Sequence, residues 1–176
     1  CTFCKLNFQK NIARSSQSVI DEIKIIESLG ISEVEIYDDT FTWSKERLIQ
    51  ICEGLIKNKN KIIWSVRDRV NKTNIDILKL MYKAGCRRIH YGIESGVQKV
   101  IDKMRKQIKV EDAVTAVNNA KKAGMSVLTY FMFGNLDETY SDMQETAKFS
   151  KSLNSDYTEF SITIPYAGTE MYEEAL

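Results

Sequence analysis

Apolar residues along the chain follow two alternating patterns, one that repeats every three or four positions and one that forms short continuous runs. Over residues 16–29, for example, Val19, Ile23 and Ile26 fall roughly on one face of a helix. The longer period predicts helices over 16–29, 44–58, 74–84, 96–104, 110–123 and 139–152. The short runs predict strands over 33–37, 61–66, 87–92, 126–132 and 157–164. Ser44 is the expected N-cap of the second helix, and a final turn and short helix are expected to follow the last strand.

Glycines mark the junctions between these elements. Gly30, Gly85 and Gly124 each follow a helical segment and precede an apolar strand, and glycine takes the left-handed conformation there at low cost. Strands that alternate with helices indicate parallel pairing with right-handed crossovers. No linker rich in proline or glycine interrupts the chain, so residues 1–176 are expected to form one α/β domain. The pattern fits a βα barrel with five strands, to which a sixth could be added ahead of Cys1. An open doubly wound sheet is the alternative, although the chain has no Gly-x-Gly-x-x-Gly motif.

Composition narrows the function without identifying it. Of 176 residues, 43% are apolar and 28% are charged, which is ordinary for a globular protein. A net charge of +1 gives no strong attraction to nucleic acid or to an anionic membrane. No apolar stretch approaches the roughly 20 residues of a membrane span, and no signal peptide is visible in the sequence.

The four cysteines divide into two kinds. Cys1 and Cys4 have the Cys-x-x-Cys spacing of a zinc half-site, a redox dithiol or part of an iron–sulfur site. Cys52 lies on the apolar stripe of a predicted helix and Cys86 opens a predicted strand, so both are expected to be buried as small hydrophobic residues. Because this is not the pattern of a secreted disulfide framework, we expect a protein of the reducing cytoplasm.

Polar residues stand where the predicted strands end. In βα barrels the active site forms at the carboxyl ends of the strands, so these residues are expected to converge on one rim. Such a rim carries carboxylates, basic groups and hydroxyls, and it could hold a zwitterionic ligand that includes a sugar. The segments concerned are Asp38-Asp39-Thr40, Arg67-Asp68-Arg69, Ile93-Glu94-Ser95-Gly96, residues 133–139 and residues 165–169.

Each of these features also has a purely structural interpretation. Two adjacent aspartates can simply solvate a loop, and Ser95 followed by Gln98 fits a capping box, as does Thr139 followed by Asp142. His90 lies in mid-strand among apolar neighbours, where a single histidine is more often structural than catalytic. The order and position of the features together, not any one of them, favour a functional site.

The combined pattern resembles the radical S-adenosylmethionine (SAM) superfamily over nearly the whole chain. More narrowly, it resembles the branch whose members often carry an upstream cobalamin-binding domain. The three cluster cysteines of that family are spaced Cys-x-x-x-Cys-x-aromatic-Cys, and Cys1 and Cys4 match the last two. The first would lie four positions before Cys1, so the resemblance implies a fragment of a longer protein. Further matches are Tyr37 to Phe41, Trp64 to Arg69, Ala84-Gly85-Cys86, Tyr91 to Gly96 and Pro165 to Thr169.

The resemblance implies a role for each matching residue. Cys1 and Cys4 would ligate irons of a [4Fe–4S] cluster, and the backbone near Phe3 would meet the adenine of SAM. The remaining cofactor-binding positions would be Asp38, Asp39 and Thr40 for the methionyl ammonium; Arg69, Glu94 and Ser95 for ribose hydroxyls or methionine polar groups; Lys106 for the methionyl carboxylate; and Gly134 and Ile164 for the adenine pocket. The chain reads Gly-Asn-Leu-Asp-Glu-Thr over 134–139, where the family commonly has Gly-Leu-Pro-Gly-Glu-Thr, and Ala167 replaces a usual proline.

The implied fold is a partial (βα)6 TIM-like barrel, and the implied reaction is reductive cleavage of SAM to a 5′-deoxyadenosyl radical. That radical would abstract hydrogen from a substrate, or methyl transfer would occur if cobalamin is held by an upstream domain. A flavodoxin or ferredoxin is the expected electron donor. Two alternatives stay open. One is a degenerate barrel without a cluster, acting as a binding or structural scaffold, and the other is a zinc or redox Cys-x-x-Cys protein, for which further ligands are poorly spaced.

Overall fold

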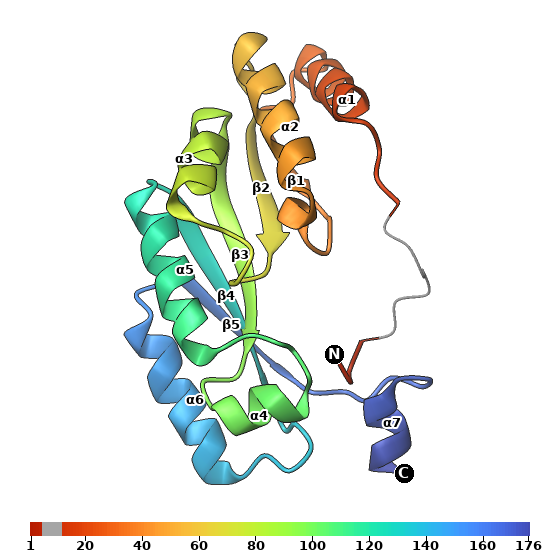
Figure 1. Ribbon diagram of the computed structural model, residues 1–176, viewed down its shortest axis with the longest axis vertical. Coiled ribbons are helices and arrows are strands. Elements are labelled where there is room, and N and C mark those ends of the chain that lie inside the picture. Colours follow the sequence, from red (N-terminus) through yellow and green to blue (C-terminus); the bar gives the residue numbers. More distant parts are fainter. Residues whose placement is uncertain (5–11) are drawn as a thin grey trace.

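A computed structural model describes residues 1–4 and 12–176, which form one parallel sheet with helices along its strands (Figure 1). The five strands lie side by side in the order of the sequence and all neighbours are parallel. They are β1 (Glu33–Ile36), β2 (Ile63–Asp68), β3 (Cys86–Glu94), β4 (Ser126–Phe133) and β5 (Tyr157–Ile162). The helices are α1 (Ser16–Ser28), α2 (Lys45–Lys57), α3 (Ile75–Lys83), α4 (Gln98–Lys103), α5 (Val110–Lys122), α6 (Tyr140–Ser152) and α7 (Glu170–Ala175), with a 3-10 turn η1 (Phe41–Trp43).

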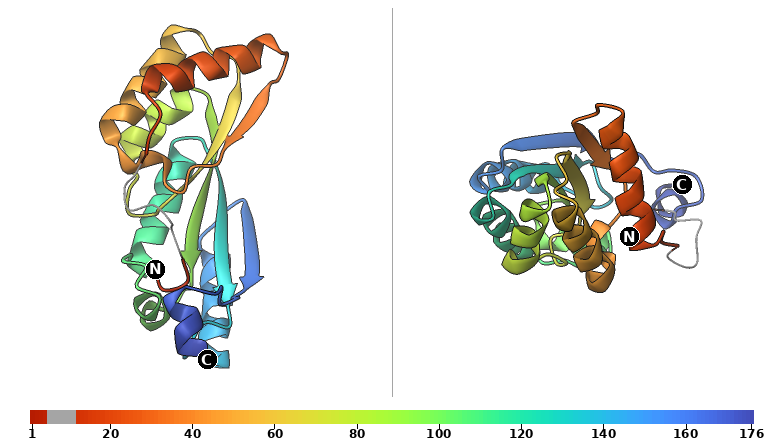
Figure 2. Two further views of the ribbon diagram at one scale, coloured as in Figure 1. Left: turned by 90° about the vertical axis from the view of Figure 1, so that its right-hand side faces the viewer. Right: turned by 90° about the horizontal axis from the view of Figure 1, so that it is seen from above.

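Among the residues that the structure describes, helices cover one face of the sheet and leave the other open. Helices α2, α3, α5 and α6 lie along the same face, and α1 packs beside α2 (Figures 1 and 2). Large side chains such as Trp64, Tyr91 and Phe131 point from the strands into this layer and are almost fully buried. We call the opposite, uncovered face the inner face. The arrangement is half of a βα barrel, which confirms the predicted α/β partial barrel and excludes helices wound on both faces.

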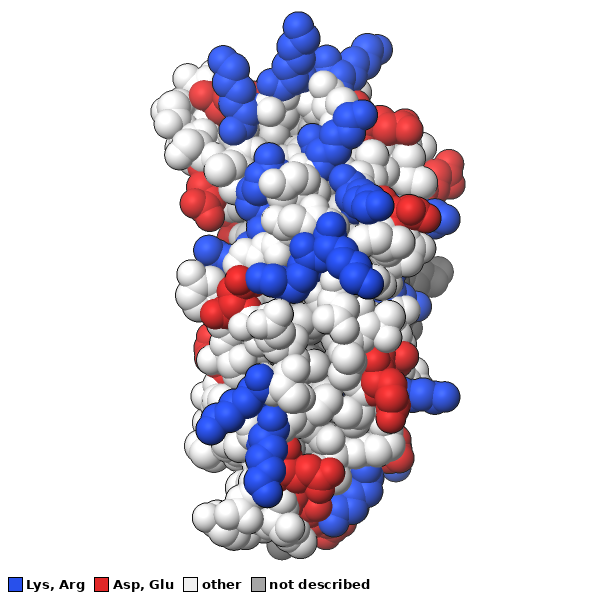
Figure 3. Space-filling view, turned by 90° about the vertical axis from the view of Figure 1, so that its left-hand side faces the viewer, with Lys and Arg blue, Asp and Glu red and all other residues white. Residues whose placement is uncertain are grey.

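Local sequence signals account for several helix ends. The hydroxyl of Ser44 accepts a hydrogen bond from the Arg47 backbone N–H, as predicted, and Asn74 caps α3 in the same way. Thr139 and Asp142 form a complete capping box at the start of α6. Lysines stand in the last turns of α2, α3 and α5, where a positive charge complements the helix dipole, and Figure 3 shows basic side chains gathered toward that end of the molecule.

The strand boundaries differ from the prediction in a way that matters for the site. Strand β2 begins two residues later than expected and continues through Asp68, because its pairing with β3 extends to Tyr91. Strand β3 runs on to Glu94, which pairs with Phe131 after a register shift. Residues that were expected to follow the strands, such as Arg67, Asp68 and Glu94, therefore lie within them and are held by the sheet.

The carboxyl ends of the strands form one edge, where distant parts of the chain meet (Figure 2). Helices α4 and α7 lie there together with residues 1–4. The Thr2 backbone N–H donates to the Met104 carbonyl at 2.9 Å, and the Met171 N–H donates to the Thr2 carbonyl at 2.9 Å. The first residues of the chain are thus fixed between α4 and α7. In the described ranges, no helix is both long and apolar enough to cross a membrane.

Candidate functional site at the carboxyl edge of the sheet

A turn that carries two cysteines lies at this edge. The Cys4 backbone N–H donates to the Cys1 carbonyl at 3.3 Å, and both thiols are free and exposed. Between them, Phe3 is half-buried and packs against a small apolar cluster of Val97, Val100 and Met104 from the α4 region. The local fold therefore anchors the aromatic residue and leaves both cysteines exposed.

The same turn adjoins a buried ion pair. The Lys106 ammonium lies 2.6 Å from Glu94 Oε1 and 5.8 Å from the centroid of the Phe3 ring. Lys106 is 7% exposed and Glu94 is 8% exposed, so the two charges are largely removed from water. The Arg69 guanidinium donates to the Lys106 carbonyl and so fixes the segment that carries the lysine. The structure thus brings together Phe3, Arg69, Glu94 and Lys106, four residues that the sequence nominated separately.

Backbone geometry at the end of β3 explains why this pair can form. Glu94 has a φ of +73°, a left-handed conformation that is uncommon outside glycine, and it follows the register shift in the pairing with β4. A Cβ atom at Gly92 would lie only 2.6 Å from Glu94 Oε1 and 3.3 Å from Lys106 Nζ. The bulge turns the carboxylate back over Gly92, and only glycine leaves room for it.

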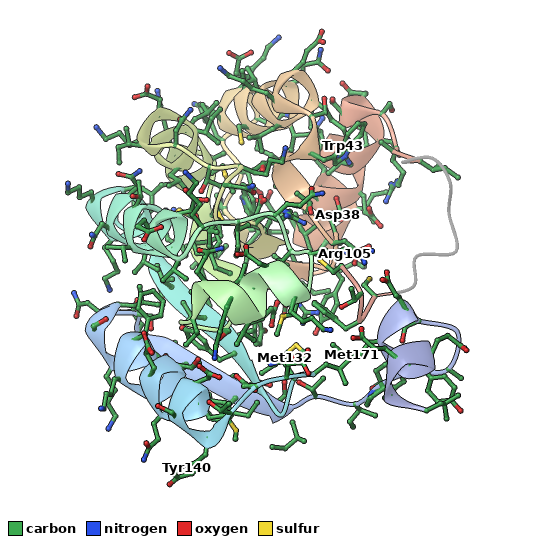
Figure 4. All side chains as sticks on the ribbon, turned by 60° about the horizontal axis from the view of Figure 1, so that its bottom comes forward. Asp38, Trp43, Arg105, Met132, Tyr140 and Met171 are labelled. Atoms are coloured by element: carbon green, nitrogen blue, oxygen red, sulfur yellow. The ribbon has the colours of Figure 1, made fainter. Side chains whose placement is uncertain are left out.

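The predicted aspartate pair lies at the end of β1, on the other side of the edge. Asp38 is half-buried and its carboxylate approaches the Arg47 guanidinium of α2 at 4.0 Å, whereas Asp39 is exposed. Thr40 is half-buried and directly precedes η1. Figure 4 looks toward this edge and shows Asp38 at the end of β1, with Arg105, Met132 and Met171 marking the loop after α4, strand β4 and helix α7.

Ser95 is turned away from the edge. Its side chain is fully buried, shares a hydrogen bond of 3.0 Å with the Thr146 hydroxyl of α6, and accepts from the Val97 N–H at 3.1 Å. The alternative interpretation of Ser95 and Gln98 as a capping box is wrong, because Val97 occupies the N-cap position of α4 and the Gln98 amide binds Asp102 and Ile108 instead. Ser95 fastens the end of β3 to α6.

The two positions expected near adenine follow β4 and β5. Gly134 has a φ of +79°, and a Cβ atom added there would have no other atom within 4 Å. Ile164 is 59% exposed. The loop after β4, residues 134–139, is ordered by its own side chains and by Thr163. The Glu138 carboxylate accepts from the Gly134 and Asn135 N–H groups at 2.7 and 3.0 Å, and Asn135 accepts from the Thr163 hydroxyl at 2.9 Å. These contacts organise the loop in the absence of the proline and second glycine that are usual in the family.

One buried acid near the edge was not selected from the sequence. The Asp68 carboxylate is 4% exposed and accepts from both the backbone N–H and the hydroxyl of Thr42, at 3.0 and 2.9 Å, and from the Arg69 N–H at 2.7 Å. Burial raises the pKa of Asp68 from 3.8 to about 6, against the opposing effect of these hydrogen bonds. Asp68 ties η1 to β2. Its position between two arginines in a predicted strand-end segment was the available signal, but nothing in the sequence showed which of the three side chains would be buried.

The remaining cysteines do not belong to the site. Cys52 and Cys86 are completely buried on the helix-covered side, and burial raises the pKa of the Cys52 thiol to about 12 and that of Cys86 well above its usual value. Across residues 1–4 and 12–176, no group of three histidine, cysteine, aspartate or glutamate side chains is arranged to hold a metal ion. This leaves a zinc site without the further ligands that it needs.

Fold and site together define a class of protein. A parallel half-barrel carries a docked Cys-x-aromatic-Cys turn beside buried charged groups at the carboxyl ends of its strands, which is the place where βα barrels bind cofactors and substrates. The chain belongs to the radical SAM superfamily, whose family model matches residues 1–150. The predicted family is therefore confirmed. The relatives are named as enzymes, which favours the predicted enzyme class over a scaffold without a cluster.

Individual relatives agree with this assignment. An uncharacterized methyltransferase of Pyrococcus horikoshii is 37% identical over 180 residues, covering 100% of this chain and 39% of the relative. The anaerobic magnesium-protoporphyrin IX monomethyl ester cyclase of Rubrivivax gelatinosus is 26% identical, covering 99% of this chain and 32% of the relative. Among solved structures, the radical SAM methyltransferase TsrM from Kitasatospora setae, with cobalamin and a [4Fe–4S] cluster bound, superposes with a TM-score of 0.83 at 19% identity, over 92% of this chain and 31% of that one. The chain thus spans about a third of the length of these relatives.

Proposed function

We propose that this chain is the core of a radical SAM enzyme that binds a [4Fe–4S] cluster and SAM at the carboxyl edge of the half-barrel. The reaction is reductive cleavage of SAM, used for hydrogen abstraction or for methyl transfer. The observation that carries the proposal is the fixed cysteine turn beside Lys106 and Glu94, in a chain of this family.

The two cysteines of the turn are suitable ligands for an iron–sulfur cluster. Cys1 and Cys4 would be two thiolate ligands, since both are free, exposed and held on one turn. The third thiolate is expected four positions before Cys1, from the family's spacing. When bound, the cluster supplies the electron that cleaves SAM, and the protein supplies placement and exclusion of water.

The chain's own residues would bind and orient SAM. Lys106 would exchange its contact with Glu94 for the methionyl carboxylate, and Glu94 would then be free to accept hydrogen bonds from ribose hydroxyls. Asp38, Asp39 and Thr40 would meet the methionyl ammonium, which suits two carboxylates at the end of β1. Phe3, Arg69, Gly134 and Ile164 complete the proposed set, while Ser95 would act through its bond to α6, which fixes the end of β3.

The relatives guide the choice of reaction. Their names describe methyltransferases and a cyclase, and TsrM binds cobalamin, so methyl transfer with cobalamin held by another domain is a specific form of the proposal. A flavodoxin or ferredoxin is the proposed electron donor. The reducing cytoplasm is the proposed location, because it would keep the exposed thiols available for the cluster.

The test supplies the third thiolate explicitly. The chain is prepared with an N-terminal Cys-Ala-Ala-Ala extension, and a Ser-Ala-Ala-Ala extension serves as the matched control. Both are reconstituted anaerobically with iron and sulfide, reduced, and mixed with SAM. We expect about four irons per cysteine-extended chain and formation of 5′-deoxyadenosine. Both are expected to be lost in Cys1→Ala and Cys4→Ala and retained in the buried-thiol control Cys52→Ala. A folded, cysteine-extended chain that takes up no iron would refute the proposal.

A further inference from the structure

The inner face of the sheet carries a band of polar side chains in place of a hydrophobic core. Every strand contributes at least one of them, and the pairing register puts them on the same face because Arg67 pairs with His90 and Tyr130 pairs with Glu159. No helix from residues 1–4 or 12–176 covers this face (Figures 1 and 2). The band consists of Glu35, Arg67, Arg88, His90, Tyr130 and Glu159.

Four residues of this band contact one another. The Arg67 guanidinium donates to Glu35 Oε1 at 3.2 Å, and its positive centre lies 3.9 Å from the Tyr37 ring centroid. His90 Nδ1 lies 3.2 Å from the Tyr130 hydroxyl and 3.6 Å from Glu35 Oε1. Arg67 thus balances the negative charge of Glu35. The two contacts of Nδ1 fix the orientation of the His90 imidazole.

Two nitrogen atoms in the band are buried without a partner. His90 Nε2 and Arg88 Nε have no hydrogen-bond acceptor within the described part of the chain, although the side chain of His90 is only 6% exposed. Arg88 makes no salt bridge in that same part, and its guanidinium lies over the Tyr157 ring at 5.5 Å from the centroid. Buried hydrogen-bond donors are nearly always paired with an acceptor. A guanidinium stays charged when it is buried, so Arg88 cannot avoid the cost of an unpaired N–H by losing a proton.

The two orphan nitrogens share a strand and a face. Residues 88 and 90 are two apart on β3, so their side chains stand side by side on the inner face, roughly 7 Å apart along the strand. If Nδ1 accepts from the Tyr130 hydroxyl, Nε2 carries the imidazole hydrogen and is a donor, as Arg88 Nε always is. Two unpaired donors beside a cation are the chemistry that binds an oxyanion.

We propose that Arg88 and His90 form an oxyanion subsite on the inner face, which holds a carboxylate or phosphate group of the substrate. The proposal rests on the proposed function, since it makes the inner face the place where the substrate lies, and it narrows the substrate to molecules that carry such a group. The other charged groups that face the subsite are Glu35, which is neutralised by Arg67, and Glu159, which lies two residues nearer the carboxyl edge than the register row of His90. Tyr130 is a positioning residue, whose hydroxyl lies 3.2 Å from His90 Nδ1.

The experiment uses the chain without a cluster, labelled with ¹⁵N. His90 is the single histidine of the sequence, so its ring signals identify themselves. The probes are glutarate, inorganic phosphate and the neutral amide glutaramide, each titrated at constant ionic strength. We expect glutarate or phosphate, but not glutaramide, to shift the His90 Nε2 signal in a saturable way. Burial lowers the pKa of His90, and a bound anion is expected to raise it. The stronger of the two anions indicates whether the natural group is a carboxylate or a phosphate.

Variants decide whether the subsite is responsible. Arg88→Gln is expected to weaken the binding by about tenfold or more, the scale for loss of a charge-assisted hydrogen-bonding group. Arg87→Gln is the matched control, because Arg87 is the neighbouring arginine but packs over the Tyr82 ring, with a centroid distance of 4.1 Å. If Arg88→Gln does not fold, Arg88→Lys keeps the charge without the fork and is expected to weaken the binding by less.

Failure of this idea is distinguishable from failure of the proposed function. The absence of saturable anion binding, equal binding of glutaramide, or equal loss in the Arg87 and Arg88 variants would each overturn the subsite. None of these results depends on the cluster. Conversely, a chain that binds glutarate through Arg88 but takes up no iron when extended would keep the subsite and refute the proposed reaction.

Discussion

The ion pair between Lys106 and Glu94 gives the most direct test of how the site is built. In Lys106→Met the side chain keeps a similar volume, and the Glu94 carboxylate, which is 8% exposed, loses the ammonium that lies 2.6 Å away. Removing one partner of a buried pair typically costs about 3–5 kcal/mol, because the other charge stays buried without compensation. For a chain of this size, each kcal/mol corresponds to roughly 2–4 °C in Tm, so we expect Tm to fall by about 6–20 °C.

The assay is urea unfolding followed by circular dichroism, with the thermal midpoint as a second measure. Two further variants make the result specific. Adding Glu94→Gln to Lys106→Met removes the uncompensated charge and is expected to recover most of the loss. Lys121→Met breaks a surface pair with Asp156, whose side chain is 32% exposed, and is expected to cost at most about 1 kcal/mol.

The size of the loss decides the question. A loss of less than about 1 kcal/mol in Lys106→Met, or no recovery when Glu94→Gln is added, would refute the view that the pair is a buried, mutually dependent unit.

Three other predictions test separate parts of the structure. The pKa of Asp68 is raised from 3.8 to about 6 in the folded chain, so its contribution favours folding below about pH 4 and is lost as pH rises through 6. The free energy of unfolding is measured by urea titration for Asp68→Asn and for the parent chain. As pH rises from about 4 to about 6, the stability of the variant relative to the parent should increase by up to about 3 kcal/mol. A difference that does not change with pH would contradict the raised pKa of Asp68. Gly96→Ala would place a Cβ 2.6 Å from the Phe149 Cβ and should cost about 1–3 kcal/mol in the same assay, whereas full stability would show that α6 can move aside. In thiol titration with Ellman's reagent, the two cysteines of the N-terminal turn should react in the folded chain and the other two only in denaturant; rapid reaction of a third thiol would contradict the burial of Cys52 and Cys86.

The sequence alone determined the order and kind of the main elements. Periodicity and the recurring glycines predicted all five strands and the helices between them, because the alternation of apolar runs with helical stripes depends only on local geometry. The cysteine spacing and the strand-end residues also sufficed to select the family, which the match over residues 1–150 confirms. Capping at Ser44 and Thr139 followed from interactions between residues three positions apart.

Only the tertiary structure decided which nominated side chains meet. Phe3 and Lys106 are far apart in sequence and come together because Thr2 bonds to Met104, a contact that no local pattern contains. Ser95 faces α6 and not the edge, since a one-residue bulge at the end of β3 sets the direction of each following side chain. The apolar sequence neighbours of His90 predict a structural role, but in the sheet those neighbours point to the helices and His90 points to the inner face. Side chains alternate between the two faces of a strand, so the surroundings of His90 are set by the adjacent strands, and only the assembled sheet supplies them.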